Sequence, residues 1–296
     1  MVELNKCPIC ESENSEIFLR SKDYFLTGED FQINQCKHCG FLFTNPRPVN
    51  SKLPEYYKTE EYISHSNSNK GIINGLYHFV RNFTLSGKVS MIRKFKSSGS
   101  VLDIGSGTGE FLVSMQKQSF SVTGVEPDVD ARNYAITTYS LNIYDENELD
   151  VFKDQSFEII TMWHVLEHVP DLLKRVQQIK RLLKSDGILI VAVPNPDSKD
   201  AIFYKNFWAA FDLPRHLYHF KKNDIVSLFK KVDMCIVKIQ PMLFDSFYVS
   251  LLSEKYKSGS QKFFKPFLIG LWSNVHAFFK SKNYSSLIYI IKHKNT

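Results

Sequence analysis

A glycine-rich turn between a short apolar run and a helix-length segment is the feature that most restricts the fold of this chain. The run 101–104 is followed at once by glycine at positions 105, 107 and 109. Glycine permits a tight turn and a close approach of a ligand to the backbone, and open sheets bind ligands at the carboxyl ends of their strands. The turn therefore predicts a strand, a ligand-binding loop and a helix, in that order.

Short apolar runs alternate with segments of helical periodicity from residue 100 onward, which is typical of βαβ units and a parallel sheet. Gly187 is expected to stop the helix before the fifth strand. We predict an α/β domain over 98–296, a doubly wound, mostly parallel sheet of seven strands with helices on both faces and a helical insertion at about 245–283. The expected strands are 101–104, 122–125, 141–144, 157–162, 188–193, 235–239 and 287–291, and the expected helices are 111–118, 129–139, 172–183 and 224–231.

The spacing of the glycines and the charge of their neighbours restrict which class of ligand the turn can bind. A dinucleotide fingerprint is Gly-x-Gly-x-x-Gly, with a pyrophosphate at the helix N-terminus. Here the third glycine follows one spacer, and Asp103 and Glu110 flank the loop. These acids repel a pyrophosphate but attract S-adenosylmethionine, which carries a cationic sulfonium and an ammonium group. Glu126, after the next strand, can accept hydrogen bonds from both ribose hydroxyls.

Four ordered motifs resemble those of the class I S-adenosylmethionine-dependent methyltransferases: 103–109, 124–127, 157–169 and 182–195. The resemblance covers roughly residues 98–240 and implies that Glu126 binds the ribose and that Glu146 or Asn147 lies near the adenine. The alternatives are that the glycine loop is only a tight turn and that Glu126 is only a helix N-cap. The other cofactor-binding residues that the resemblance implies are Asp103, Gly105, Ser106, Gly107, Gly109, Pro127 and Trp163.

Four of the five cysteines form two Cys-x-x-Cys pairs within the first 39 residues, too clustered to be a disulfide framework for the chain. Two such pairs complete a closed four-thiolate zinc site. A hairpin at roughly 18–33 is expected between the pairs, with Gly40 relieving strain after the second. We predict a small zinc ribbon over 1–48, the alternatives being a redox dithiol or a chance pairing. The expected ligands of a structural Zn²⁺ are Cys7, Cys10, Cys36 and Cys39.

Residues 49–97 are predicted to form a helical connector or lid. Their second half places apolar residues at three- and four-residue spacing, which indicates an amphipathic helix. The residues concerned are Ile72, Ile73, Leu76, Phe79, Val80 and Phe83.

A histidine-rich loop, residues 206–220, follows the fifth predicted strand, and we call it the histidine loop. It resembles a segment of zinc-ribbon-bearing methyltransferases, among them sugar C-methyltransferases, in which a Glu-His pair occurs; here Pro214 and Arg215 precede His216. A hydroxyl or an acidic carbon must lose a proton before methylation, and histidine is suited to accept it. We predict His216 as the general base and Arg215 as a clamp on an anionic acceptor. His219 and His164 are the competitors, and the alternative is that these histidines only stabilise the loop.

Charge and hydropathy limit the partners. Residues 1–50 hold five Lys or Arg against seven Asp or Glu, so nucleic acid is not the expected partner of the zinc ribbon. No apolar run is long enough to span a membrane, and no secretory signal is visible, so a cytoplasmic protein is expected. The aromatic and lysine-rich segment 263–280 is expected to pack on its own core, the alternative being peripheral contact with a membrane.

The predicted activity is therefore S-adenosylmethionine-dependent methyl transfer to a hydroxyl or carbon of a small-molecule, sugar or lipid-linked acceptor. Two alternatives stay open: an RNA methyltransferase that uses the zinc ribbon to bind its substrate, and a non-catalytic cofactor-binding module. The sequence does not predict an oligomeric state.

Overall fold

The computed structural model describes residues 1–57 and 72–294. The chain forms two compact units that are discontinuous in sequence. Unit 1 comprises Met1–Lys58, His164–Val176 and Val191–Ile290, and unit 2 comprises Thr59–Trp163, Gln177–Ile190 and Ile291–Thr296. The part of the predicted connector at 58–71 lies outside the described residues, as do the side chains of 72–82.

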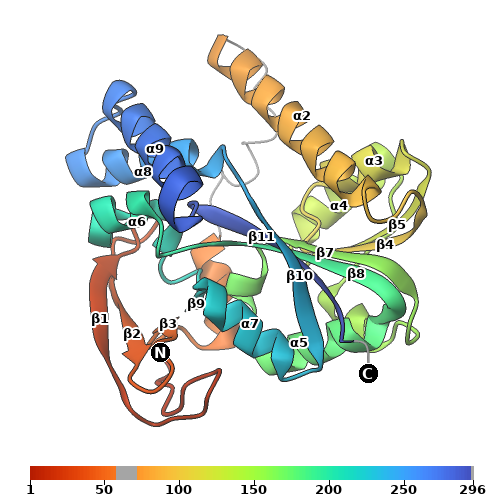
Figure 1. The fold of residues 1–296 in the computed structure, drawn as a ribbon, viewed down its shortest axis with the longest axis horizontal. Coiled ribbons are helices and arrows are strands. Elements are labelled where there is room, and N and C mark those ends of the chain that lie inside the picture. Colours follow the sequence, from red (N-terminus) through yellow and green to blue (C-terminus); the bar gives the residue numbers. More distant parts are fainter. Residues whose placement is uncertain (58–71, 295–296) are drawn as a thin grey trace. The chain divides into compact units, whose positions relative to one another are not determined.

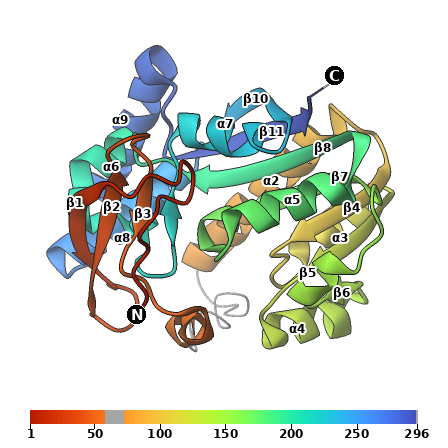
Figure 2. The same ribbon diagram turned by 90° about the horizontal axis from the view of Figure 1, so that it is seen from below.

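The α/β fold predicted from the sequence is confirmed, with seven strands in one sheet. Three neighbouring pairs, β4 with β5, β4 with β7 and β5 with β6, are parallel, and Figure 2 shows β4, β5 and β6 side by side. The order across the sheet is β10 (Met234–Pro241), β11 (Ser286–His293), β8 (Leu183–Pro194), β7 (Phe157–Trp163), β4 (Gly99–Ile104), β5 (Phe120–Val125) and β6 (Ile143–Tyr144).

One boundary was predicted wrongly. Strand β8 starts at Leu183, directly after helix α5 (Leu172–Leu182), so Gly187 lies inside the strand instead of behind a helix. A Cβ at Gly187 would lie 2.8 Å from Leu183 Cδ1 and 2.9 Å from the Lys184 carbonyl oxygen. The glycine is therefore explained by close packing within the strand and not by a helix stop.

One α-helix of unit 2 begins where the sequence offers a suitable side-chain cap. Asp128 precedes α4 (Val129–Tyr139) and accepts a hydrogen bond from the Ala131 N–H at 2.8 Å, which satisfies one of the unpaired donors of the first turn. The other helical elements in or bordering this unit are α2 (Ile72–Arg93), α3 (Glu110–Gln116), the 3₁₀ turn η2 (Glu146–Asp150) and the second half of α5.

Unit 1 contains a second, four-stranded sheet in the order β1 (Ser15–Lys22), β2 (Asp30–Cys36), β3 (Leu42–Thr44) and β9 (Tyr218–His219). The antiparallel β1–β2 pair is the hairpin expected between the cysteine pairs. Strand β3 pairs with β9, which lies in the histidine loop. The cysteine-bearing segment and the histidine loop are therefore parts of one sheet.

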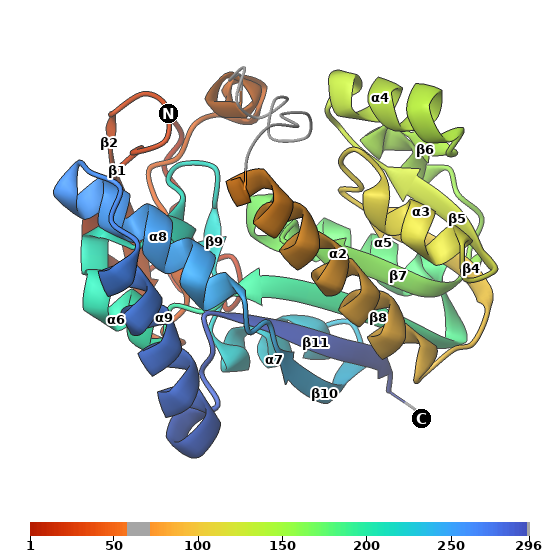
Figure 3. The ribbon, with the colours of Figure 1, turned by 90° about the horizontal axis from the view of Figure 1, so that it is seen from above.

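The remaining elements of unit 1 are mostly helical. Helices α8 (Asp245–Ser258) and α9 (Phe264–His276) lie side by side in Figures 1 and 3, and no helix among the described residues is long and apolar enough to cross a membrane. The others are η1 (Asn50–Tyr57), η3 (Leu166–His168), α6 (Lys199–Tyr204), η4 (Lys205–Phe207), η5 (Ala209–Phe211), α7 (Lys222–Lys230) and the π-helical turn η6 (Ala277–Ser281).

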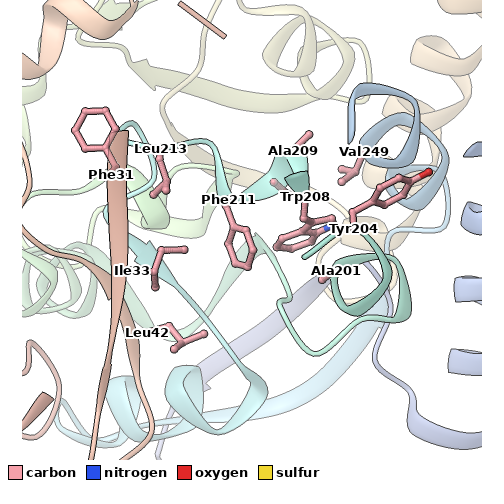
Figure 4. Close-up of a cluster of buried hydrophobic side chains, with 11 residues drawn as sticks. Phe31, Ile33, Leu42, Ala201, Tyr204, Trp208, Ala209, Phe211, Leu213 and Val249 are labelled. Atoms are coloured by element: carbon pink, nitrogen blue, oxygen red, sulfur yellow. The ribbon is translucent and has the colours of Figure 1, made fainter. Parts of the chain in front are cut away.

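A cluster of buried apolar side chains fixes the start of the histidine loop (Figure 4). Trp208 and Phe211 point into it, with their ring centroids 4.9 Å apart and edge to face. Ile33 of β2 and Leu42 of β3 close one side, and neither is exposed to solvent. The loop is thus anchored on the small sheet by packing before its polar residues begin.

Candidate functional site

The glycine loop of unit 2 has the backbone that its sequence predicts. Gly105, Gly107 and Gly109 have φ values of 73°, 53° and 88°, in the left-handed region that side chains rarely adopt. A Cβ at Gly109 would lie 2.6 Å from Leu141 Cδ1, whereas a Cβ at Gly107 would meet no heavy atom within 4 Å. The loop is therefore closely packed at its helix end and open at its middle, where a ligand can approach the backbone.

Asp103 lies at the end of β4 and is almost fully buried. Its Oδ1 accepts a hydrogen bond of 2.6 Å from Thr161 Oγ1 on the adjacent strand. Burial raises the pKa of Asp103 to about 7, while Thr161 and the ammonium group of Lys88 act in the opposite direction. A carboxyl group of this kind changes charge near neutral pH, so its interaction with a cationic ligand depends on pH.

Glu126 ties the glycine loop to the helix that follows β5. Its Oε2 accepts from the Gly107 N–H at 2.7 Å, and its Oε1 accepts from the Asp128 N–H at 2.9 Å. Burial raises the pKa of Glu126 above its usual value. A carboxylate oxygen can accept more than one hydrogen bond, so these contacts leave capacity for the hydroxyls of a ribose.

The polar atoms around the loop fit S-adenosylmethionine. Ser106 Oγ and Trp163 Nε1 are buried without a hydrogen-bond partner, and buried polar groups normally have one. Lys88 Nζ lies 4.1 Å from the centroid of the Trp163 ring, so this ring already faces one cation. A ligand that combines hydroxyl and amino groups with a cationic centre matches these atoms and the two acids.

The residues expected near the adenine lie in η2, directly after β6. Asn147 is exposed, and its Nδ2 donates to Asp145 Oδ1 at 2.7 Å. Arg132 of α4 forms an ion pair of 3.4 Å with the other Asp145 oxygen. Glu146 is half-buried in the same turn, and Pro127 is exposed at the end of β5. These residues belong to unit 2 together with the glycine loop, and their contact with adenine stays a prediction.

The four N-terminal cysteines come together in unit 1, with one sulfur atom of each within 4.8 Å of the others. The Sγ atoms of Cys7 and Cys39 are 3.6 Å apart, and those of Cys10 and Cys36 are 3.5 Å apart. Thiolates 2.3 Å from one tetrahedral ion would be about 3.8 Å apart. These four cysteines form no disulfide, and the two distances are compatible with a closed four-thiolate zinc site.

The two cysteine knuckles repeat the same backbone turn. The N–H of Glu11 donates to the Cys7 carbonyl oxygen, and that of Gly40 donates to the Cys36 carbonyl oxygen, both at 2.9 Å. Both donor residues have positive φ, 63° for Glu11 and 77° for Gly40. The glycine predicted to relieve strain after the second pair therefore has that role, and the first knuckle tolerates the same conformation with a glutamate.

His216 has one nitrogen that can accept a proton. Its Nδ1 lies 2.9 Å from the Ala210 carbonyl oxygen, which can only accept a hydrogen bond, so the proton is assigned to Nδ1 and the lone pair to Nε2. Asp212 Oδ2 lies 4.0 Å from that Nε2. The imidazole is nearly buried. It is therefore held in the tautomer that a general base requires.

Glu167 supplies the acidic neighbour that the sequence around His216 lacks. It lies in η3 and is fully buried; its Oε1 forms an ion pair of 3.3 Å with His164 Nδ1, while Oε2 receives no hydrogen bond. Burial alone would raise the pKa of Glu167, but the imidazoles of His164, His216 and His168 lower it below its usual range. The backbone fixes this arrangement, because the Leu217 N–H donates to the Glu167 carbonyl oxygen at 2.8 Å.

His168 completes a group of three residues with Glu167 and His216, one ligand atom of each lying within 4.8 Å of the others. The ring centroids of His168 and His216 are 4.6 Å apart. Burial and the neighbouring His216 lower the pKa of His168 to about 4, so it is neutral at neutral pH. Chemically, such a group can share a proton or coordinate a divalent cation.

His164 is poorly suited to accept a proton. Its Nδ1 lies 3.3 Å from Glu167 Oε1, and its Nε2 lies 3.1 Å from Asp245 Oδ2. Burial opposes its charge, but the two carboxylates outweigh burial and raise the pKa of His164 to about 10. A histidine that is already protonated at neutral pH cannot act as a general base there.

His219, the other competitor, is buried on β9. Thr44 Oγ1 donates to the His216 carbonyl oxygen at 2.6 Å, so its contact of 3.2 Å with His219 Nε2 requires the imidazole to be the donor. Burial lowers the pKa of His219 well below its usual value. His219 is therefore a buried, neutral side chain whose imidazole donates to Thr44 of the neighbouring strand.

Arg215 does not have the surroundings of a substrate clamp. Its guanidinium donates to Asp212 Oδ1 at 2.6 Å and to Asp23 Oδ1 at 3.0 Å, and a third donor reaches the Tyr56 carbonyl oxygen at 3.1 Å. The side chain is buried, and its cation lies 4.6 Å from the centroid of the Phe25 ring. Arg215 thus joins the histidine loop to the N-terminal segment by internal ion pairs.

Sequence reasoning missed Glu167, Asp212 and Asp23. Glu167 lies within the motif 157–169, and its place three residues after His164 is the available signal. Asp23 is 192 residues from Arg215 in the chain, and no local pattern indicates their pairing.

Comparison with known protein families finds a match that covers most residues of the candidate site. A family model described as a methyltransferase domain matches residues 78–239, just over half of the chain. The match includes the glycine loop, Glu126 and the segment that contains Glu167 and His216.

Curated relatives share the same region. A ubiquinone biosynthesis O-methyltransferase of Actinobacillus pleuropneumoniae is 29% identical over 170 residues, which is 53% of this chain and 72% of that protein. The enzyme of the same name from Glaesserella parasuis is 36% identical over 110 residues, 33% of this chain and 47% of that protein. The second alignment therefore spans about half the length of the relative.

Solved structures show the same fold. An S-adenosylmethionine-dependent methyltransferase of Archaeoglobus fulgidus superimposes with a TM-score of 0.51 at 17% identity, covering 72% of this chain and 94% of that one. Another from Thermotoga maritima has a TM-score of 0.50 at 17% identity, covering 74% and 96%.

Proposed function

The chain belongs to the methyltransferase-domain family of S-adenosylmethionine-dependent enzymes, and we propose that it methylates a hydroxyl group of a small-molecule acceptor, with His216 as the general base. The observation that carries this proposal is the lone pair assigned to Nε2 of His216, in a buried group that also contains the carboxylate of Glu167. The name O-methyltransferase borne by the curated relatives supports a hydroxyl over a carbon acceptor.

The donor site is proposed on unit 2. When bound, S-adenosylmethionine supplies an electrophilic methyl group on a cationic sulfonium. Glu126 would hold the ribose, Asp103 would face the cationic methionyl part, and the open backbone at Gly107 would let the ligand approach. Ser106 and Trp163 would each gain the hydrogen-bond partner that they lack.

The acceptor-activating residues are proposed on unit 1. His216 would take the hydroxyl proton at Nε2 while its Nδ1–H stays bonded to the Ala210 carbonyl oxygen. The resulting imidazolium would be stabilised by Glu167, whose Oε2 receives no hydrogen bond. Arg215 and His219 are positioning residues in this proposal, because their polar groups are already bound within the loop.

The Zn²⁺ proposed on Cys7, Cys10, Cys36 and Cys39 has a structural role. Four thiolates leave no open coordination position for chemistry. The metal would fix the end of β2 and the turn that leads into β3, and β3 pairs with β9 of the histidine loop. Zinc would therefore support the position of His216 without touching a substrate.

The acceptor itself is proposed as a small phenol, sugar or lipid-linked alcohol. An RNA acceptor is disfavoured because the cysteine-bearing segment holds more acids than bases. Small-molecule acceptors need no such basic surface.

The test is methyl transfer from radiolabelled S-adenosylmethionine to a panel of phenols, sugars and polyprenyl-linked sugars. We expect turnover with one class, a loss of about a hundredfold or more in His216→Gln, and unchanged cofactor affinity in that variant. His219→Gln is the control in the same loop and should lose much less. Full turnover in His216→Gln, or transfer only to carbon, would overturn the assignment, and absence of turnover with every class would favour a non-catalytic module.

A further inference from the structure

Helix α9 and the turn after it carry their large apolar side chains on the outside. The two most exposed are Phe264 and Phe279, with 78% and 75% of their surface accessible. Single exposed apolar residues are ordinary, but a contiguous set of this size marks an interaction site. The full set is Phe263, Phe264, Phe267, Leu268, Leu271, Trp272, Val275, Phe278 and Phe279, and we call it the aromatic stripe.

The buried face of α9 explains why the stripe cannot turn inward. It consists of small residues, of which Gly270 packs so closely on α8 that a Cβ would lie 2.9 Å from the Ser246 carbonyl oxygen. Ser273 Oγ donates to Asp200 Oδ1 at 2.6 Å. The helix is thus fixed with its face of Pro266, Gly270 and Ser273 toward the protein, whereas a surface helix usually turns its large apolar side chains inward.

Lysines lie near both ends of the stripe. Glu254 is the last acidic residue of the chain, and eight lysines follow it. Glu254 itself is buried and paired with Lys265 at 2.9 Å. At the two ends of the stripe, Lys262 and Lys280 are exposed. The surroundings of the stripe therefore carry positive charge.

We propose that the aromatic stripe is a docking surface for an anionic lipid bilayer, in which α9 lies flat at the interface. Aromatic side chains with flanking lysines are the composition that binds such an interface. The 17 residues from Phe263 to Phe279 extend about 25 Å at 1.5 Å per residue, less than the roughly 20 residues that a span requires. The helix is suited to lie on a membrane and not to cross it.

The charge pattern favours a lipid surface over a second copy of the chain. A symmetric dimer through the stripe would bring the lysines of both copies together without an acid to pair with them. An anionic headgroup layer supplies the opposite charge at both ends of the stripe. The docking surface does not depend on the proposed function, although it would suit an acceptor that is itself held in a membrane.

The test is binding of the full chain to vesicles of phosphatidylglycerol and, separately, of phosphatidylcholine. We expect cosedimentation with the anionic vesicles, at least tenfold weaker binding to the neutral ones, and weakening by salt. Trp272 provides a second readout, because it is exposed while Trp208 is buried. Its emission should shift to shorter wavelength on the anionic vesicles, and Trp272→Phe should lose most of that shift yet still sediment.

Two sets of variants test the apolar and the charged parts of the docking surface separately. Phe264→Ser with Phe279→Ser should reduce binding at least tenfold, and Lys262→Glu with Lys280→Glu should remove the preference for anionic lipid. Val151→Ser, at a residue 74% exposed in unit 2, is the matched control and should bind normally. Each variant must retain its affinity for S-adenosylmethionine. This control distinguishes reduced vesicle binding from unfolding of the methyltransferase domain.

Two results would overturn the proposal. One is equal binding to neutral and anionic vesicles, or binding to neither. The other is a dimer in analytical ultracentrifugation that Phe264→Ser with Phe279→Ser dissociates, which would make the stripe an interface between copies.

Discussion

Leu42 of β3 and His219 of β9 are partners in an antiparallel strand pair. The cysteine-bearing segment and the histidine loop therefore belong to one sheet. Thr44, two residues after Leu42, donates from Oγ1 to the His216 carbonyl oxygen at 2.6 Å. Strand β3 therefore connects the cysteine site to the proposed base, so a shift of β3 would also move His216. We therefore expect the proposed zinc site to support the position of the proposed base without any chemistry of its own.

Loss of the metal should reduce methyl transfer more than it reduces donor binding, because the cysteines and the histidine loop share unit 1 while the donor residues lie in unit 2. We expect one zinc per chain in elemental analysis, and Cys36→Ser should lose the metal and most turnover. Its affinity for S-adenosylhomocysteine should stay within a few-fold of wild type. Cys235→Ser, which changes the cysteine outside the cluster, is the control and should keep zinc and activity.

Removing one partner of the buried Arg215 ion pairs should destabilise the protein strongly. Asp23→Asn removes one of the negative charges that balance the buried Arg215 guanidinium. Breaking such a buried ion pair costs about 3–5 kcal/mol. The measurement is the free energy of unfolding in urea. As a control, Lys22→Met breaks the exposed ion pair of 3.8 Å between Lys22 and Asp30. This variant should change the free energy of unfolding by about 0.5 kcal/mol or less. Equal effects of the two variants would contradict the buried assignment.

The His164 ion pairs should make stability depend on pH in a defined direction. The pKa of His164 is raised to about 10 in the folded state against about 6.5 unfolded. The stabilisation is complete below pH 6.5 and is lost as pH rises toward 10, because only the folded state keeps the proton in that range. The fall of the melting temperature from pH 6.5 to 10 should be smaller in His164→Asn, which also tolerates the φ of 57° at this position. A wild-type melting temperature that does not fall over this range would refute the raised pKa.

Gly109→Ala should disturb the start of α3 through packing as well as backbone strain. Its φ of 88° is unfavourable for alanine, and the new Cβ would lie 2.6 Å from Leu141 and 3.1 Å from the Ala135 Cβ. Gly28→Ala is the control with positive φ and nothing within 4 Å, and should show only the strain of about 1–2 kcal/mol. Comparable losses in unfolding free energy would mean that packing at Gly109 is not important.

The parallel sheet could be predicted because each of its strands is a local apolar run ended by a turn or helix signal. The four-cysteine cluster could be predicted because thiolate pairs at fixed spacing have few other uses. The two-residue strand β9 and its pairing with β3 could not, since the contact joins residues more than 170 positions apart. The same holds for Arg215, whose neighbours in sequence indicated a substrate clamp while its partner Asp23 comes from the first hairpin.

The most direct test of the account is calorimetric titration of the protein with S-adenosylmethionine at pH 6 and pH 8, and with NADH as the competing ligand. We expect S-adenosylmethionine to bind more tightly at pH 8, because Asp103, with a pKa of about 7, is then ionised and attracts the cationic ligand. Asp103→Asn should weaken binding and remove most of this pH dependence, and Glu126→Gln should weaken binding at both pH values. Tight binding of NADH, or S-adenosylmethionine affinity that neither substitution changes, would contradict the donor site and with it the proposed methyl transfer.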